Sequence, residues 1–311
     1  MSSATLTKSV DTTTKASKKA PPKRSEFDDL PRSLRPSPVV RILVVVGLVL
    51  AFIYFIAPIY WLVVSASKSN TDLITSNPLL PANNNFVANY ESLMGWTGGM
   101  FWRWVANSVF YSTVAGAVGT LFSVAAGYSL AKFRFFGKNT ILGVVMSGLL
   151  LPIALLTIPL YLMFSQLQLT ETIWAIIIPS CVSPFGVFLG LVYSRNSVPD
   201  EMLEAARIDG AGELRIFFSL VLRLLAPAMV TIFLFIFVAT WNNFLLPLLM
   251  VSSTAELKPV TLGLYGMMSY FNPVYGAVLQ GAIFGVIPLI LLFLGLQRFW
   301  QAGLAAGSVK G

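Results

Sequence analysis

Few side chains in this sequence could carry out acid–base, nucleophilic or metal chemistry. The chain of 311 residues has no His, and its one Cys, Cys181, lies within an apolar run. Without imidazole the chain lacks the usual general base and metal ligand at neutral pH. A Cys among apolar residues most often serves as a small buried hydrophobe. We therefore expect no catalytic residues, no metal site and no cofactor bound by this chain.

Two amides and an indole form the most distinctive polar group within apolar sequence. Trp241, Asn242 and Asn243 lie in a stretch without charged residues that runs from 224 to 255. Amides in such surroundings are costly unless they are paired, so they face either another helix or an aqueous path. A sugar suits such a path, because its hydroxyls bond to amides and its ring face stacks on Trp. The three residues are candidates for lining a translocation path, and hydrogen bonding between helices is the equal alternative.

A short charged segment between two apolar blocks has the pattern of a separate helix. Pro199 suits the first position of a helix, acidic residues follow it, and Gly210 is a natural stop. The sequence predicts a helix over 199–208, about 15 Å long and too polar to span a membrane. A helix seated in a groove of a partner protein is the functional interpretation, and one resting on a lipid surface is the alternative. Three residues form its apolar stripe: Met202, Leu203 and Ala206.

The elements that must position these residues are long apolar helices. Hydrophobic residues make up 56% of the chain and charged residues only 11%, whereas a soluble domain is about a quarter charged. Charged residues are absent from six blocks, each long enough for the roughly 20 residues that span a bilayer. Closely spaced glycines such as Gly186 and Gly190 favour close helix packing. We predict an all-α integral membrane protein with six transmembrane helices near 42–64, 105–131, 141–164, 173–194, 227–250 and 277–297.

Positive charge is distributed unevenly between the two ends of these helices. Of the 21 Lys and Arg residues, all but Lys68, Arg103 and Lys258 fall in segments on the side of the N-terminus. Short basic loops remain in the cytoplasm, so both termini and the short charged helix are predicted to be cytoplasmic. The net charge of +8 then reflects orientation, not nucleic-acid binding. Residues 1–38 are predicted to form a disordered basic cytoplasmic tail, and residues 39–311 the six-helix transmembrane domain.

The predicted helices offer no machinery to energise transport. They contain no Asp, Glu, Lys or Arg that could couple transport to protons. The chain also lacks the G-x-x-x-x-G-K-[ST] loop that cradles nucleotide phosphates, so it does not hydrolyse ATP by itself. A pump built on this chain must draw its energy from a partner at the cytoplasmic face. A stand-alone secondary transporter or channel is the alternative, and it predicts transport by the purified chain without any ATPase.

The short charged segment resembles the EAA loop of ABC importer permeases. Glu204, Ala205 and Ala206 are followed after three residues by Gly210 and then by an apolar run, which is the spacing of that family. Arg223 stands where the family usually has Pro. The resemblance implies that this segment is the coupling helix, which fits a cleft in an ATPase subunit. It assigns the ATPase contact to Met202, Leu203, Glu204, Ala205, Ala206 and Gly210.

Further segments are similar to the carbohydrate, maltose-type branch of the same family. They are Asn107-Ser108, Tyr128 to Phe136, Ile158 to Tyr161, Trp241 to Phe244 and the ending, Gln297 to Gly311. The ending is similar to that of the second of two paired permeases, whose C-terminal tail reaches between two ATPase subunits. The resemblance implies this second ATPase contact for Gly307, Ser308, Val309, Lys310 and Gly311.

The resemblance also implies a function and a set of partners. The chain would be a membrane-spanning permease subunit of an ATP-driven carbohydrate importer in a prokaryotic cell membrane. Its partners would be a homologous permease, an ATPase subunit dimer, an extracytoplasmic sugar-binding protein, the carbohydrate itself and membrane lipid. ATP and Mg would be bound by the ATPase subunits. The sequence does not indicate which sugar is carried.

Overall fold

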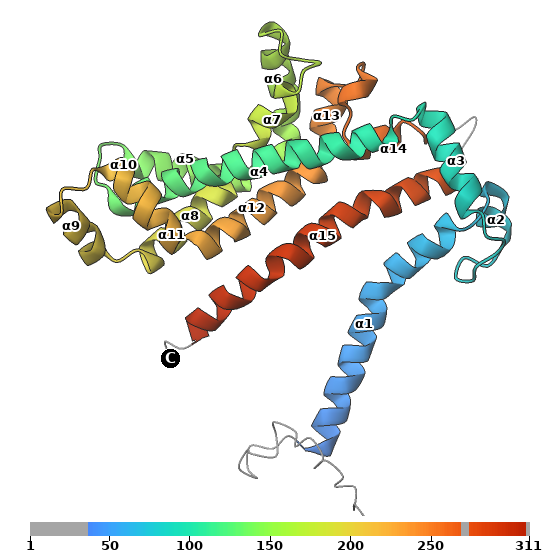
Figure 1. Ribbon diagram of the computed structural model, residues 1–311, viewed down its shortest axis with the longest axis horizontal. Coiled ribbons are helices and arrows are strands. Elements are labelled where there is room, and N and C mark those ends of the chain that lie inside the picture. Colours follow the sequence, from blue (N-terminus) through green and yellow to red (C-terminus); the bar gives the residue numbers. More distant parts are fainter. Residues whose placement is uncertain (1–36, 269–273, 309–311) are drawn as a thin grey trace, which may run out of the picture. The chain divides into compact units, whose positions relative to one another are not determined.

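The chain is helical throughout the residues that its computed structural model describes, 37–268 and 274–308 (Figure 1). No strand occurs among these residues. The chain forms two compact units, divided between Ala57 and Pro58. The first unit contributes most of α1 (Pro38–Ala66), a long apolar helix. Residues 1–36 of the predicted tail lie outside the described residues, and Pro38, its last residue, is the first residue of α1.

The centre of the second unit is a group of three helices: α4 (Phe101–Lys132), α8 (Pro184–Ser197) and α12 (Ala226–Trp241). The most extensive contacts between helices join α4 to α8 and to α12, and Figure 1 shows α4 and α12 running alongside each other. The buried face of α4 is rich in small residues, including Gly116, Gly119, Ser123 and Gly127. Small side chains allow helix backbones to approach closely where apolar surroundings supply no other strong driving force.

Helices α4 and α8 approach until their backbones nearly touch. A Cβ added at Gly127 would lie 2.4 Å from both the carbonyl carbon of Gly190 and the nitrogen of Leu191. A Cβ added at Gly186 would lie 2.5 Å from the hydroxyl of Ser123. The predicted close packing at Gly186 and Gly190 is therefore confirmed as a contact within the chain. At Gly127 and Gly190 the neighbouring atoms belong to the backbone, so only a residue without a side chain fits at these two positions.

Three of the predicted continuous helices are interrupted in the structure, and the one expected over 173–194 is divided between Ser180 and Pro184. The helix expected over 141–164 consists of α5 (Lys138–Leu150) and α6 (Ile153–Gln166), which are bent by 108°. Pro152 stands at this break; proline has no N–H to continue the helical bonding. The helix expected over 227–250 ends at Trp241, and a separate short helix, α13 (Leu245–Met250), follows.

A second sharp bend precedes α12. The segment Glu213–Leu224 contains α10 (Glu213–Ile216), a π-helical turn (Phe217–Val221) and α11 (Leu222–Leu224). It meets α12 at 82°. Helix α7 (Trp174–Ser180) leads into α8 in one span-length segment, Trp174–Ser197. Among the described residues, four helices are long and apolar enough to cross a membrane, or six if each bent pair counts as one span.

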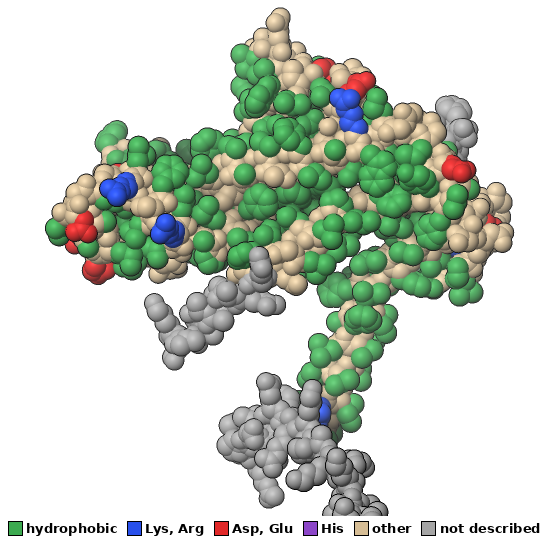
Figure 2. All heavy atoms as spheres, in the orientation of Figure 1, with side chains coloured by type: hydrophobic (Ala, Val, Ile, Leu, Met, Phe, Trp, Pro, Cys, Tyr) green, Lys and Arg blue, Asp and Glu red, His purple; other side chains and the backbone are tan. Residues whose placement is uncertain are grey.

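The remaining helices enclose a second core. They are α2 (Asn70–Thr75), α3 (Phe86–Thr97), a short 3-10 helix (Ala255–Leu257), α14 (Val260–Tyr265) and α15 (Tyr275–Ser308). Helix α15 packs against α3, α12 and α14 around Phe101, Trp104 and Trp241. Figure 2 shows hydrophobic side chains over much of the visible face of the helices. Acidic and basic side chains gather near the short helix α9 (Asp200–Ile208) and near the loops at the other end of α4.

Candidate functional site

The predicted short charged helix is present as α9 (Asp200–Ile208). It is one residue shorter than predicted, because Pro199 has an extended ψ of 139° and occupies the N-cap position. Asp200 and Glu201 lie in the first turn and Arg207 in the last turn. These charges complement the partial charges at the two ends of a helix. The local sequence therefore favours a helix of this length even though it is short.

Gly210 ends α9 in the manner that its sequence position predicted. Its φ is +77°, a left-handed conformation that side-chain-bearing residues rarely adopt. The N–H of Gly210 donates to the carbonyl of Arg207, and the N–H of Ala211 donates to the carbonyl of Ala206, both at 3.0 Å. This pair of bonds is the Schellman motif, which satisfies the last carbonyls of a helix. Gly210 thus fixes where α9 stops.

The apolar stripe predicted for α9 is divided between two faces of the helix. Leu203 is only 2% exposed, and it lies in a core cluster with Tyr128 and Phe217, against which Ala206 also packs. Met202 instead points outward, and Ile208 is 86% exposed. Glu204 and Ala205 are exposed as well. One face of α9 therefore anchors the helix, and the other presents acidic and apolar side chains together.

Two ion pairs hold α9 at its ends. Lys132 Nζ, at the end of α4, lies 2.8 Å from Asp200 Oδ1, and the Lys132 side chain is largely buried. Arg207 reaches Glu213 of α10 through Nε at 2.7 Å and Nη2 at 3.4 Å. The hydrogen bond to Glu213 raises the pKa of the Arg207 guanidinium above its ordinary value. Helix α9 is consequently tied to α4 as well as to α8, which it follows in the chain.

Removing the charge of Lys132 tests how firmly α4 holds α9. Lys132→Met is expected to speed amide hydrogen exchange in α9 by up to about fivefold, because such pairs contribute about 0.2–1 kcal/mol. Combining Lys132→Asp with Asp200→Lys is expected to restore part of the protection, since a basic residue in the first turn opposes the helix dipole. Exchange is measured by mass spectrometry on the chain in nanodiscs. Equal exchange in Lys132→Met and wild type would show that the packing of Leu203 suffices.

At the opposite end of α4, side chains hold the loop between α13 and α14, residues 251–259. The loop contains the 3-10 helix and no longer element. Side chains of α4 donate hydrogen bonds to its backbone carbonyls: Arg103 Nε to Glu256 at 3.1 Å, Trp104 Nε1 to Ala255 at 2.8 Å, Asn107 Nδ2 to Glu256 at 2.7 Å and Lys258 at 3.0 Å, and Tyr111 Oη to Leu257 at 3.0 Å. This arrangement fixes the loop backbone on α4.

Two N–H groups of the same loop donate hydrogen bonds to Glu171, which lies outside α4. The two carboxylate oxygens of Glu171 accept from the N–H groups of Ser253 at 3.1 Å and Thr254 at 3.0 Å. Ser108 Oγ of α4 accepts from the N–H of Val260, where α14 begins, at 2.8 Å. Asn107-Ser108 stood out in the sequence only as part of a resemblance, and this role was missed, since the partners lie about 150 positions away.

The three candidates for a translocation path lie in different surroundings. Trp241 is 3% exposed and stacks on Phe237 with ring centroids 5.8 Å apart. Asn242 is exposed, and its Nδ2 donates to the carbonyl of Val238 within its own helix at 3.0 Å. Asn243 Oδ1 accepts from the N–H of Leu246 at 3.4 Å, at the start of α13. The two amides thus bond to nearby backbone where α12 ends.

The last predicted contact segment is described only in part. Gly307 and Ser308 are the final two residues of α15. Val309, Lys310 and Gly311 lie outside the described residues. Within the ranges that the structure covers, no group of three or more His, Cys, Asp or Glu residues could hold a metal ion.

Apolar helices of membrane-spanning length, with one short charged helix exposed at one end, define a multi-pass helical membrane protein. Residues 119–305 match the family described as "binding-protein-dependent transport system inner membrane component". The chain belongs to this family. It is therefore a permease-type subunit of the cell membrane and not an enzyme.

Relatives of the chain are named as transport permeases, and the chain matches them over nearly their full lengths. The arabinooligosaccharides transport system permease protein AraQ of Halalkalibacterium halodurans is 33% identical over 285 residues, which cover 89% of this chain and 99% of that protein. The lactose transport system permease protein LacG of Rhizobium radiobacter is 31% identical, covering 84% of this chain and 93% of that protein.

The fold has a counterpart among solved structures. A chain in the crystal structure of a bacterial ABC transporter involved in the import of the acidic polysaccharide alginate superposes with a TM-score of 0.73. The match covers 85% of this chain and 99% of that chain, at 23% sequence identity. At this identity the likeness is one of fold. The expected membership of the ABC importer permeases is confirmed by the family match.

Proposed function

We propose that this chain is a membrane-spanning permease subunit of an ATP-driven carbohydrate importer. Family membership and relatives named for arabinooligosaccharide and lactose transport support the proposal. The observation that carries it is the exposed face of α9, where Glu204 and Ala205 stand beside Met202 and Ile208. An apolar surface bordered by acidic groups at the end of a helix bundle suits a protein partner, and this chain has no phosphate-binding loop of its own.

The proposed topology has six spans with both termini in the cytoplasm. Each bent pair, α5 with α6 and the segment 213–224 with α12, then counts as one span. The ion pair between Lys132 and Asp200 supports placing α9 at the same side as the end of α4. The loop held by α4 lies at its other end, about 40 Å away by helix length. The distribution of Lys and Arg supports placing the α9 side in the cytoplasm.

Helix α9 would couple the membrane helices to an ATPase subunit that binds ATP and Mg. Its outward residues, Met202, Glu204 and Ala205, would enter a cleft of that subunit, and Leu203 and Ala206 would carry the displacement into the core around Tyr128. Coupling requires that α9 makes different contacts in the inward- and outward-facing states. We propose a second ATPase contact for the C-terminal residues 307–311. A homologous permease and an extracytoplasmic sugar-binding protein would complete the complex.

Asn242 is the strongest candidate for contact with the solute among the three path residues. Its side chain is exposed beside the end of α12, whereas Trp241 is enclosed by its own chain. An exposed amide within apolar helices offers both a donor and an acceptor to sugar hydroxyls. Trp241 would then support the position of Asn242 by stacking on Phe237.

The test of the proposed function is transport by the complex isolated through a tag on this chain. The complex is reconstituted in vesicles with its binding protein, and oligosaccharides are screened for uptake and for stimulation of ATP hydrolysis. We expect one class of oligosaccharide to stimulate both, and a Glu204→Lys variant to hydrolyse ATP without sugar-dependent stimulation. A complex that contains no ATPase subunit would contradict the proposal.

The purified chain alone separates the proposal from its rival. A secondary transporter or channel would move solute in vesicles that contain only this chain, whereas a permease subunit would not. Uphill transport by the chain alone would contradict the coupling role proposed for α9. Its absence, together with transport by the full complex, would support it.

A further inference from the structure

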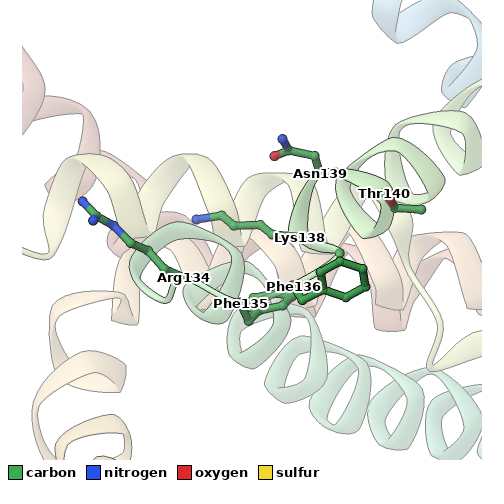
Figure 3. Close-up of a pocket in the computed structure, with 7 residues that line it drawn as sticks. Arg134, Phe135, Phe136, Lys138, Asn139 and Thr140 are labelled. Carbon is green, nitrogen blue, oxygen red and sulfur yellow. The ribbon is translucent and has the colours of Figure 1, made fainter.

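The loop that connects α4 to α5 forms an open pocket of about 430 Å³, lined by Arg134, Phe135, Phe136, Gly137, Lys138, Asn139 and Thr140 (Figure 3). Sites for small molecules commonly measure about 300–1,000 Å³. The loop follows Lys132, whose ion pair with Asp200 places it at the α9 end of the molecule. Because α4 and α5 are apolar helices of a membrane protein, this loop lies where the bilayer meets water.

The shape of the pocket comes from how the chain leaves one helix and enters the next. Phe133 is extended, with ψ at 152°, and so ends α4. Gly137 has a φ of +81° and is the N-cap of α5, to which it contributes no side-chain hydrogen bond. The first N–H groups of α5 are therefore left without a side-chain cap beside the pocket. Such groups favour a negatively charged neighbour.

The charge of the pocket is wholly positive. Its lining contains two basic side chains and no acidic one. In Figure 3 the side chains of Arg134 and Lys138 extend toward the same side of the loop. Lys138 Nζ donates one hydrogen bond to the carbonyl of Phe133 at 2.9 Å, which leaves two of its three donors for a ligand. Among the described residues no acidic side chain pairs with Arg134.

The pocket lining also includes exposed apolar side chains, which a small free anion would not shield from water. Phe136 is fully exposed and Phe135 is 41% exposed. A phenyl ring at the bilayer surface is stabilised by contact with acyl chains, not with water. Cationic groups beside exposed rings therefore match a molecule with a phosphate and a hydrocarbon tail. Basic pockets beside membrane helices bind lipid head groups through this combination.

We infer that the pocket at the α4–α5 loop binds the head group of an anionic phospholipid, with Arg134 and Lys138 on the phosphate and Phe135 and Phe136 against the acyl chains. Its assignment to the inner leaflet rests on the proposed topology. Binding itself requires only that the loop meets the bilayer surface.

The test measures retained lipid in the detergent-purified complex by native mass spectrometry, after exchange into mixtures of phosphatidylglycerol and phosphatidylcholine. Wild type is expected to retain phosphatidylglycerol preferentially. In the double variant Arg134→Gln with Lys138→Gln, the ratio of retained phosphatidylglycerol to phosphatidylcholine is expected to fall roughly thirtyfold. Each basic residue near the surface contributes about a factor of five. Lys138→Arg, which keeps the charge, is expected to retain it.

A second double variant controls for net charge. Arg215→Gln with Arg223→Gln removes two exposed positive charges outside the pocket and is expected to lower the preference far less than the pocket variant does. Equal loss in both double variants, or unchanged retention in the pocket variant, would overturn the inference. Displacement of the lipid by millimolar inorganic phosphate would identify a free anion as the occupant. Loss of the ATPase subunit with unchanged lipid retention would identify a protein contact. None of these results would affect the transport role of α9.

Discussion

Gly210→Pro is expected to abolish ATP-driven uptake while the chain still inserts in the membrane. Proline fixes φ near −65°, whereas Gly210 has a φ of +77°. Proline also removes the N–H that donates to the carbonyl of Arg207. The combined cost is about 3 kcal/mol or more, which corresponds to roughly a hundredfold loss of ordered α9. Uptake by the reconstituted complex and the amount of chain in membranes are the two measurements.

Two control variants separate the conformation of Gly210 from a general effect of substitution. Asn tolerates the left-handed region better than other residues, so Gly210→Asn is expected to retain most of the uptake. Gly212 has an ordinary φ of −72°, and no atom lies within 4 Å of a Cβ built there, so Gly212→Ala is expected to behave as wild type. Normal uptake by Gly210→Pro would count against a coupling role for α9.

Gly127→Ala is expected to destabilise the whole second unit, although Ala favours helices by about 0.8–1 kcal/mol over Gly. The added methyl would lie 2.4 Å from backbone atoms of Gly190 and Leu191, which no change of side-chain rotamer can relieve. Forcing α4 and α8 apart costs about 1–3 kcal/mol or more. The free energy of unfolding is measured by titration with a denaturing detergent.

The matched control for this substitution is Gly143→Ala in α5. Nothing lies within 4 Å of a Cβ built at Gly143, so the gain in helix propensity is unopposed. We expect Gly143→Ala to be at least as stable as wild type. Gly127→Ala with wild-type stability would show that the helices can separate without cost, contrary to the packing observed.

The sequence was most informative where structure depends on neighbours along the chain. Pro199, the acidic residues after it and Gly210 predicted α9 to within one residue, because capping and turn signals act locally. The faces of that helix were less predictable. Met202 and Leu203 are both apolar, and only the packing of Leu203 against Tyr128 and Phe217 decides which one turns inward.

The interruptions of the helices were also partly visible in the sequence. Pro152 was present within the predicted helix 141–164, but a proline permits either a gentle kink or a full break, and neighbouring helices decide between them. Asn242 and Asn243 bond to nearby backbone groups, and this local competition ends α12 before the apolar block does. Apolar composition alone therefore overestimated the length of that helix.

The bonds that fix the loop between α13 and α14 could not be predicted from one sequence. Asn107 and Ser108 meet groups about 150 positions later, and no local pattern encodes such a distance. The six-span topology and the contacts of α9 with an ATPase stay predictions, since both depend on a membrane and on partner chains.

The main chain of that loop has a consequence for how the protein could diversify. The carbonyls of residues 255–258 accept hydrogen bonds from α4, and the N–H groups of Ser253 and Thr254 donate to Glu171. Over this part of the loop, side chains such as Glu256 and Lys258 are therefore the groups left to contact another molecule. Substitutions at these positions would alter affinity without reshaping the scaffold beneath them. Substitutions in this loop can thus change what this end of the protein binds during evolution, while the fold stays the same.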